Sequence, residues 1–467
     1  MENVAGYRVE HDSMGEVLVP SDAYYAAQTV RTRENFPISG LRFSRTFLWA
    51  LGLVKAAAAH TNVTLGLLDC PRGTAIAQAA IEVAEGRFDN EFVVDVFQSG
   101  SGTSTHMNAN EVIATRAAEL LGGVSSDTVH IHPNDHVNMG QSTNDVFPTV
   151  IHVAALALVE KQLLPALHSL TQSLAGKADE FTKVVKAART HLQDAVPITL
   201  GQEFSGYASV ISHGIRRIEN SKQHPAELPL GGTAVGTGLN APPRFTELAI
   251  AELNSRTGLT FRPAENAFEA MQNRDACVET SAALKIVAIG FMKIANDLRL
   301  LASGPRTGLA EIILPSLQPG SSIMPGKVNP VIPEAATMVA AQIIGNDLII
   351  SVSALNGNLD LNVMMPVIAF NLLQSIEIAA AAARTLAEKC IRGITADVQK
   401  CRSYAEATAA LVTALAPTFG YENAARLFQR ALKEEKTIRQ VIAEERLLST
   451  EQLDTILDLS ALAAGRR

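Results

Sequence analysis

Four stretches of the chain combine small hydroxyl residues, glycine, asparagine, histidine and lysine with few carboxylates. The first runs from Ser99 to Asn108 and reads SGSGTSTHMN. Ser101, Gly102 and Thr103 offer backbone N–H groups and side-chain O–H donors, a combination that can hold a carboxylate. The stretch therefore predicts an anion-binding loop, although a surface loop without a ligand would have the same composition.

The second stretch contains two short motifs, HPND at His132–Asp135 and QSTND at Gln141–Asp145. In the second motif, Ser142, Thr143 and Asn144 again offer donors to an anion. A helix is predicted to begin directly after this motif, and the same side chains could simply cap it. The two functions are compatible, because the N-terminus of a helix attracts negative charge.

The third stretch, RTHLQD at Arg189–Asp194, contains one histidine. A single histidine between a threonine and an apolar residue is most often structural. Near repeated anion-binding patterns, however, His191 is a candidate for chemistry, because a histidine can polarise water or carry a proton near neutral pH.

The fourth stretch, GSSIMPGKVNP at Gly320–Pro330, holds two glycines and two prolines in eleven residues. This composition predicts an ordered, non-helical loop. The loop gathers two serines, an asparagine and Lys327, whose positive charge suits a dianionic substrate. Glu334 follows at the start of the next predicted helix. So many donors in one short loop indicate a binding site rather than a plain surface turn.

Long helices are predicted to position these stretches. Five Pro-poor segments rich in alanine and leucine each have the length of a helix of more than twenty residues. They are Val150–Lys177, Leu200–His224, Asp275–Ser303, Glu334–Leu355 and Val367–Ile391. Strand-type alternation is rare, so the segments predict a helical bundle. Pro165 and Pro366 are expected to kink or begin their helices.

The regions on either side of the bundle have a different texture. Residues 1–140 mix short apolar runs with polar loops and include one amphipathic helix at Thr74–Glu85. From residue 395 the chain is more charged, and three short helices are predicted at Glu406–Leu415, Glu422–Lys433 and Ile438–Glu445. We therefore predict three domains, at residues 1–140, 141–394 and 395–467.

Composition limits the possible partners and cofactors. The 467-residue chain has a formal net charge of −8, which argues against nucleic acid or an anionic membrane as a partner. Its four cysteines are scattered without a CxxC pair, which predicts free thiols in a reducing cytoplasm and no metal cluster. The segment Ala335–Leu359 carries one charge but several amides and serines, which favours burial in a subunit interface over a membrane span.

The loop GSSIMPGKVNP resembles the signature loop of the fumarase/aspartase superfamily. HPND, QSTND, RTHLQDA, GGTAVGTGLN and ASGPR follow the order and spacing of that family, so the resemblance covers nearly the whole chain. It implies an all-α, three-domain helical lyase whose long central helices form the core of a homotetramer. It also implies active sites shared by three subunits, a small dicarboxylate substrate, and neither a cofactor nor a metal.

The resemblance also implies roles for individual residues. Ser321 resembles the serine that, as an alkoxide, removes the proton beside one carboxylate of the substrate. His191 resembles the histidine that serves the proton at the departing group, through water. Lys327 and Asn329 resemble the residues that bind the carboxylate on which charge develops, and Glu334 resembles a glutamate that orients the histidine.

Two further sets of residues carry over by motif. The expected substrate-binding residues are Ser101, Gly102, Thr103, Ser142, Thr143, Asn144, Thr190, Ser322 and Val328. A second, non-catalytic anion site is expected at His132, Pro133, Asn134 and Asp135.

The implied reaction is the reversible hydration of fumarate to (S)-malate through an aci-carboxylate intermediate. HPND, GGTAVGTGLN and ASGPR resemble the fumarase pattern, whereas Thr143, Ser21–Tyr25 and Val328–Glu334 resemble the aspartase pattern. Conversion of aspartate to fumarate and ammonia therefore stays open as an alternative, as does an inactive helical relative. His106 departs from both patterns, which usually have asparagine at this position.

Overall fold

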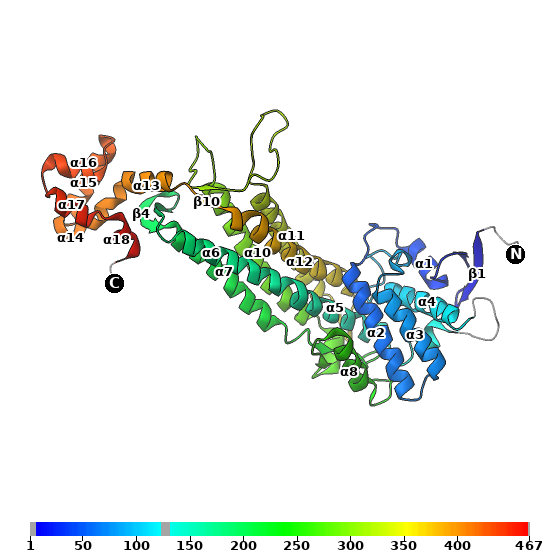
Figure 1. The fold of residues 1–467 in the computed structure, drawn as a ribbon. Coiled ribbons are helices and arrows are strands. Elements are labelled where there is room, and N and C mark those ends of the chain that lie inside the picture. The colour runs from blue at the N-terminus through cyan, green and yellow to red at the C-terminus, as the bar shows by residue number, and fades with distance from the viewer. Residues whose placement is uncertain (1–5, 123–130, 466–467) are drawn as a thin grey trace. The chain divides into compact units, whose positions relative to one another are not determined.

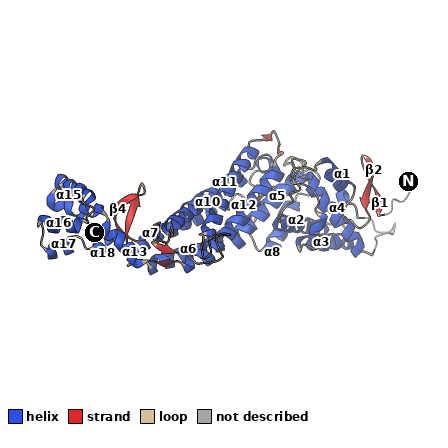
Figure 2. Ribbon diagram, turned by 90° about the horizontal axis from the view of Figure 1, so that it is seen from above, coloured by secondary structure: helices blue, strands red, loops and turns tan. Residues whose placement is uncertain are grey.

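The computed structural model describes residues 6–122 and 131–465, and its elements are mostly helices. Figure 1 traces the chain, and Figure 2 shows how few residues form strands. Within the described residues every sheet has two strands. The all-α prediction is therefore confirmed.

The internal contacts of the chain divide it into two compact units. Unit 1 comprises residues 1–164, 216–286 and 341–379, and unit 2 comprises residues 165–215, 287–340 and 380–467. The ends of both units include residues outside the described ranges. The division into three domains at residues 140 and 394 stays a prediction.

The first part of unit 1 is a hairpin followed by packed helices. Its elements are β1 (Tyr7–Asp12), β2 (Gly15–Pro20), α1 (Ala27–Asn35), α2 (Arg45–Thr64), α3 (Cys70–Ala84), η1 (Asp89–Glu91), α4 (Thr103–Leu120), η2 (Pro133–Val137) and α5 (Thr143–Leu158). Helix α2 packs against α3 and α5, and α4 packs against α3. The predicted helix at Thr74–Glu85 is confirmed as the larger part of α3, which ends before Gly86.

Small residues allow these helices to approach closely. A Cβ atom added to Gly52 of α2 would lie 2.5 Å from the carbonyl oxygen of Ala80 in α3. Ala56, Ala57 and Ala58 of α2 are fully buried. Aromatic residues make up only 5% of the chain, and the contact between these helices is instead filled by small aliphatic side chains that let the backbones approach closely.

The remaining elements of unit 1 are short, apart from the long helices described below. They are β5 (Glu227–Leu228), α8 (Phe245–Thr257), β6 (Arg262–Pro263), α9 (Ala267–Gln272), β8 (Gly357–Asn358) and β9 (Leu361–Asn362). Helix α8 packs against α2.

The long helices lie close to their predicted positions. They are α6 (Leu164–Glu180), α7 (Leu200–Ser221), α10 (Asp275–Leu301), α11 (Val331–Ala354) and α12 (Met365–Thr385). Pro366 is the second residue of α12, where the missing N–H group costs nothing. Pro366 therefore begins a helix, as predicted, whereas Pro165 lies within the continuous helical stretch Thr143–Glu180 and does not begin it.

The helix predicted at Val150–Lys177 begins seven residues earlier, as α5, and is interrupted before α6 by the wide turn η3 (Val159–Leu163). The start was wrong because Ser142 and Asp145 form a capping box that begins the helix inside the polar motif. Pro148 lies inside the helix and does not stop it.

Helix α11 is apolar but carries satisfied polar groups on its buried side. The Asn346 amide donates to Gln374 Oε1 at 2.9 Å and to Ser375 Oγ at 3.0 Å. Asp347 accepts from Ser281 Oγ at 2.8 Å and Lys285 Nζ at 2.6 Å. These partners come from α10 and α12, which explains how a nearly uncharged helix tolerates an amide and a carboxylate.

Three helical stretches are long and apolar enough to cross a membrane by length and composition alone: Thr143–Glu180, Val331–Ala354 and Met365–Gly393. The first and third are mostly buried inside the structure, whereas only a third of the Val331–Ala354 window is buried. Met338, Leu348 and Val352 on α11 are exposed. This helix therefore presents apolar surface that the described chain does not cover.

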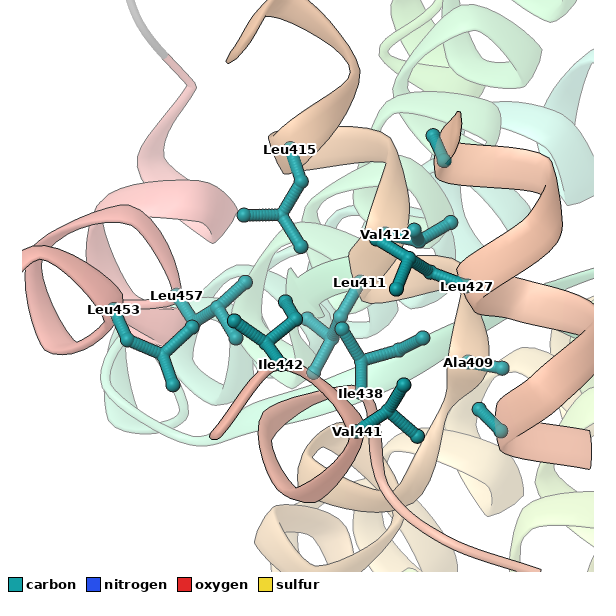
Figure 3. Close-up of a cluster of buried hydrophobic side chains, with 12 residues drawn as sticks. Ala409, Leu411, Val412, Leu415, Leu427, Ile438, Val441, Ile442, Leu453 and Leu457 are labelled. Carbon is teal, nitrogen blue, oxygen red and sulfur yellow. The ribbon is translucent and has the colours of Figure 1, made fainter. Parts of the chain in front are cut away.

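The C-terminal part of unit 2 has its own small core (Figure 3). Its elements are β10 (Thr395–Ala396), α13 (Val398–Ala407), η6 (Ala409–Leu415), α14 (Ala416–Phe419), α15 (Tyr421–Lys433), α16 (Ile438–Glu445), α17 (Thr450–Ile456) and α18 (Leu459–Ala464). Leu415, Leu427 and Ile442 are fully buried at its centre. The helices predicted at Glu422–Lys433 and Ile438–Glu445 are confirmed.

The helix predicted at Glu406–Leu415 is wrong. The chain breaks at Thr408, which is extended and whose Oγ1 accepts a hydrogen bond from the backbone N–H of Ala410. Thr408 thereby ends α13 and caps the 3₁₀ turn η6. The apolar spacing was continuous, but a local side-chain cap interrupted the helix.

The same unit contains a hairpin that the sequence analysis missed. Strands β3 (Val185–Thr190) and β4 (Gln193–Thr199) pair antiparallel, and the chain turns at His191 and Leu192, with φ values of 56° and 59°. Two further short strands, β7 (Ile312–Ile313) and β10, pair elsewhere in the unit. The hairpin matters because its turn carries a candidate catalytic residue.

A buried histidine in α5 makes the stability of the fold depend on pH. His152 Nδ1 lies 2.8 Å from the carbonyl oxygen of Glu227, and burial, assisted by the charge of Arg274, lowers the pKa of His152 to about 4. An unfolded histidine titrates near 6.5, so acidification favours the unfolded chain between these two values. We expect a loss of about 3 kcal/mol of unfolding free energy as pH falls from about 6.5 to about 4.

Urea unfolding of His152→Asn across this pH range tests the expectation. Asparagine can still donate to Glu227 but cannot take up a proton, so the variant should lose most of the acid sensitivity that the wild type shows. His168→Asn, at an exposed position on α6, is the matched control and should keep the wild-type pH profile. An unchanged pH profile in His152→Asn would contradict the assignment.

Candidate active site

The first predicted loop ends earlier than expected, because helix α4 begins at Thr103. Gly102 precedes it with φ 85°, a left-handed conformation, and a Cβ atom there would lie 2.2 Å from the ring of Phe147. Only glycine fits this position. Ser101 Oγ lies 2.8 Å from Thr103 Oγ1, so the two hydroxyls stand together at the N-terminus of the helix.

The second predicted motif lies at the N-terminus of α5. Ser142 Oγ accepts from the backbone N–H of Asn144 at 3.2 Å, and Asp145 Oδ1 accepts from that of Ser142 at 2.9 Å. The other oxygen of Asp145 accepts from the backbone of Gly231 at 2.9 Å and Thr233 at 3.0 Å. One buried carboxylate therefore ties the QSTND motif to the GGTAVGTGLN segment.

A hydrogen bond brings the two predicted stretches together. Nδ1 of His106, in the second turn of α4, lies 2.7 Å from Oγ1 of Thr143, the first residue of α5. Asn144 Nδ2 donates to the carbonyl of Ala234 at 2.9 Å. Because the positive ends of two helix dipoles meet here, the arrangement favours a negatively charged ligand.

Charged groups are buried directly behind this position. Lys55 of α2 is fully buried and its Nζ donates to Asn138 Oδ1 at 3.1 Å and Gln141 Oε1 at 2.9 Å. Burial lowers the pKa of Lys55 well below its ordinary value, and Asp145 opposes the shift. Burial raises the pKa of Asp145 to about 6, although the hydrogen bonds from backbone N–H groups and the charge of Lys55 act to lower it.

The predicted second anion site forms one compact turn. His132 Nδ1 accepts from the backbone N–H of Asn134 at 3.2 Å and of Asp135 at 3.0 Å. Pro133 is the first residue of η2, and the side chains of Asn134 and Asp135 are exposed. The four residues lie together, as predicted, and their role in binding an anion stays a prediction.

Ser321 is the candidate with the most informative geometry. Its Oγ accepts hydrogen bonds from the backbone N–H of Ile323 at 3.2 Å and of Met324 at 2.8 Å. Two backbone donors aimed at one hydroxyl oxygen stabilise the alkoxide over the alcohol, which is what a serine needs in order to act as a base.

The loop around Ser321 is closed by its own backbone. The N–H of Gly320 donates to the carbonyl of Lys327 at 2.7 Å, and Asn329 Nδ2 donates to the carbonyl of Gly320 at 2.7 Å. A Cβ atom on Gly320 would lie 2.8 Å from the backbone nitrogen of Asn329 and 2.8 Å from the carbonyl oxygen of Lys327. Glycine is therefore required at this close approach. Lys327, Val328 and Ser322 are exposed in the same loop.

The β3–β4 turn presents the third candidate group. Thr190 and His191 are exposed, so His191 can reach a ligand and exchange protons with water. Two residues of strand β3, which leads into the turn, contact Glu311. Arg189 Nη1 lies 2.9 Å from Glu311 Oε1 and 3.0 Å from Oε2, and Lys186 Nζ lies 3.1 Å from Oε2. The fully buried Glu311 therefore anchors the strand that carries His191.

The structure brings the predicted residues together in separate groups. Unit 1 holds two groups. One lies at the N-termini of α4 and α5 and comprises Ser101, Gly102, Thr103, Ser142, Thr143 and Asn144, and the other is the turn His132–Asp135. In unit 2, Ser321, Ser322, Lys327, Val328 and Asn329 share one loop, Thr190 and His191 share the hairpin turn, and Glu334 is the fourth residue of α11. Its predicted action on His191 stays a prediction.

Three supporting residues were missed by sequence reasoning. Lys55 is the one charge in the apolar run Phe47–Ala59, a signal that could have identified it. Asp145 was placed in a motif without a role, and Glu311 has no sequence signal, since its partners lie more than a hundred residues away. Residues 6–122 and 131–465 include no group of three or more metal-ligating side chains that could hold a metal ion.

The profile of the lyase family matches residues 15–345, and that of the fumarase C C-terminus matches residues 411–464. Together they cover the candidate loops, helices α6, α7 and α10 and most of the C-terminal core, whereas α12 lies outside both matches.

Individual relatives match nearly the whole chain. A class II fumarate hydratase of Mycobacterium tuberculosis is 53% identical over 99% of this chain and 97% of its own length. An aspartate ammonia-lyase of a Bacillus species is 49% identical over 97% of this chain and 96% of its own length. The crystal structure of a class II fumarase from Schistosoma mansoni superimposes with a TM-score of 0.95 at 40% identity, covering 98% of this chain and 99% of the other.

Proposed function

The chain belongs to the lyase family that includes class II fumarases and aspartate ammonia-lyases, and from this premise we propose that it hydrates fumarate reversibly to (S)-malate. The two backbone N–H groups that converge on Ser321 Oγ carry the mechanistic part of the proposal. Fumarate hydratase relatives with identities around 50% support the choice of substrate.

The first chemical step, written from malate, is removal of a proton from the carbon beside a carboxylate. The alkoxide of Ser321 takes this proton, and the electron pair moves onto the neighbouring carboxylate to give the aci-carboxylate. Lys327 and a second N–H of Asn329 neutralise the added charge. Their interaction is stronger with the intermediate than with malate, which is the condition for catalysis.

The second step breaks the bond between carbon and the hydroxyl oxygen. The electron pair returns from the aci-carboxylate to form the double bond, and hydroxide leaves with a proton delivered by His191 through a water molecule. The products are fumarate and water, so the reverse sequence adds water to fumarate. The donors at the N-termini of α4 and α5 hold the carboxylates of the substrate.

Loss of ammonia from aspartate is the second candidate, because the 49% identical Bacillus relative is an aspartate ammonia-lyase and both reactions pass through an aci-carboxylate of the same type. An ultraviolet assay of fumarate loss decides between them. We expect rapid loss in buffer alone, with malate as product, and no further loss when ammonium is added. Loss that requires ammonium and gives aspartate would replace the proposal with the second candidate.

We further propose that the active enzyme is a homotetramer whose sites are completed by three subunits. The exposed apolar side chains of Met338, Leu348 and Val352 on α11 support burial against other copies. Light scattering should give a solution mass four times that of the 49.7-kDa chain. A monomer with full activity would contradict both shared sites and the tetramer.

The cytoplasm is the proposed compartment, where fumarate hydration is a step of the tricarboxylic acid cycle. All four cysteines are free thiols, and Cys277, Cys390 and Cys401 are buried, which suits a reducing environment. Fractionation of cells that express the tagged protein tests this proposal, and recovery with membranes would contradict it.

A further inference from the structure

His106 is a buried side chain beside the proposed substrate site, and the mechanism above gives it no role. It lies in α4 with 1% of its surface exposed, and its Nδ1 is 2.7 Å from Thr143 Oγ1. Thr143 is itself 8% exposed and is the first residue of α5. The one side-chain donor that Thr143 can offer to a substrate oxygen is therefore the hydroxyl that His106 contacts.

The direction of this hydrogen bond decides what Thr143 can do. A threonine hydroxyl has one hydrogen and two lone pairs. If the hydroxyl donates to His106 Nδ1, its hydrogen is used inside the protein and only a lone pair faces the ligand. If His106 Nδ1–H donates instead, the Thr143 hydrogen is available to an anion.

The surroundings of the second imidazole nitrogen favour the latter arrangement. Nε2 of His106 is buried and has no hydrogen-bond partner among the residues that the structure describes. With a proton on Nε2, a buried N–H donor would remain unsatisfied, at a cost that native structures rarely accept.

Lys55 acts on the same ring. Burial, and after it the charge of Lys55, hold the pKa of His106 well below its ordinary value, so the imidazole is neutral near pH 7. A neutral ring carries a single proton, on either Nδ1 or Nε2. Nδ1 has a partner, Thr143 Oγ1 at 2.7 Å, whereas Nε2 has none among the described residues, so a proton on Nδ1 is the arrangement that leaves no buried N–H unsatisfied.

We propose that His106 is a positioning residue that donates from Nδ1–H to Thr143 Oγ1 and thereby turns the Thr143 hydroxyl hydrogen towards a carboxylate oxygen of the substrate. The inference rests on the proposed function for the identity of that substrate, a dicarboxylate. It assigns His106 to the orientation of a ligand donor and gives it no proton-transfer step.

Steady-state kinetics with fumarate tests the inference through Thr143. His106→Leu removes the donor to Thr143 and should raise KM about tenfold or more. The lost contact binds substrate and transition state equally, so kcat should stay within about twofold of the wild type. In a Thr143→Val background, the same His106→Leu change should have no further effect on KM. Equal effects of His106→Leu in both backgrounds would show that the histidine acts by packing, and would overturn the proposal.

A second variant separates donor loss from disturbed packing. The amide nitrogen of His106→Asn can occupy the position of Nδ1 and donate to Thr143 Oγ1, so this variant should keep KM within about threefold of the wild type. His106→Gln places its amide near the position of Nε2 and should behave like His106→Leu. A high KM in His106→Asn and a normal KM in His106→Gln would contradict the assignment of Nδ1 as the donor.

Neutron diffraction from perdeuterated crystals examines the same bond without any activity. Deuterium on Nδ1 of His106 is the expected result, and deuterium on Nε2 overturns the inference whatever the substrate. If the wild type instead released ammonia from aspartate, the proposed function would fail, while the neutron result and the kinetic cycle, repeated with aspartate, would still decide the role of His106.

Discussion

Replacement of Ser321 with alanine is expected to abolish turnover and to leave the folded assembly intact. The side chain is the proposed base, and its Oγ accepts from two backbone N–H groups that stabilise the alkoxide. Removal of a positioned general base costs about 10²–10⁴-fold in rate, and we expect kcat to fall at least 10³-fold here. The loop should survive, because its closing bonds, Gly320 N–H to Lys327 and Asn329 to Gly320, do not involve the hydroxyl.

Fumarate hydration by Ser321→Ala should be measured beside Met324→Leu, a similar-sized change in the same loop. Met324 offers its backbone N–H to Ser321, and its half-exposed side chain has no proposed role. We expect this control to retain activity within about twofold of the wild type. Light scattering should give the same solution mass for all three proteins. Wild-type-like turnover in Ser321→Ala would remove Ser321 as the base.

Glu311→Gln is expected to cost about 3–5 kcal/mol of unfolding free energy, the range for breaking a buried ion pair from one side. Glu311 is fully buried and contacts both Lys186 and Arg189 of strand β3. The neutral amide would leave Arg189 without its carboxylate partner and Lys186 with Glu203 only, at 2.7 Å. Because β3 leads directly into His191, kcat should fall as the turn loses its anchor.

Urea unfolding and hydrogen exchange of the β3–β4 amides measure these two effects. Glu406→Gln is the matched control, because Glu406 pairs with Arg402 on the surface, where such pairs contribute within about 0.5 kcal/mol. The double variant Lys186→Met/Glu311→Gln should lose less than the sum of the single variants, since the two side chains interact directly. Equal stabilities of Glu311→Gln and Glu406→Gln would show that the buried contact does not stabilise the hairpin.

The amino-acid sequence alone determined the helical class and the nature of the chemistry. Apolar segments of more than twenty residues with few prolines are too long for ordinary strands and favour helices, so the positions of α7, α10, α11 and α12 were predictable to within a few residues. The loop at Gly320–Pro330 was predictable for a similar reason, since its glycines and prolines exclude a helix while its serines and lysine remain as donors. The capping box at Ser142 and the cap at Thr408 were misjudged, because each depends on which of several local hydrogen bonds forms.

Only the tertiary structure decided how the candidate residues are supported. Glu311 meets Lys186 and Arg189 across more than a hundred residues of chain, and no local pattern encodes such a meeting. The contact of His106 with Thr143 likewise depends on how the N-termini of α4 and α5 pack, which Gly102 permits by leaving room for Phe147. Side-chain type sets what a residue can donate or accept, but burial and distance decide which partner it finds, and both are properties of the folded chain.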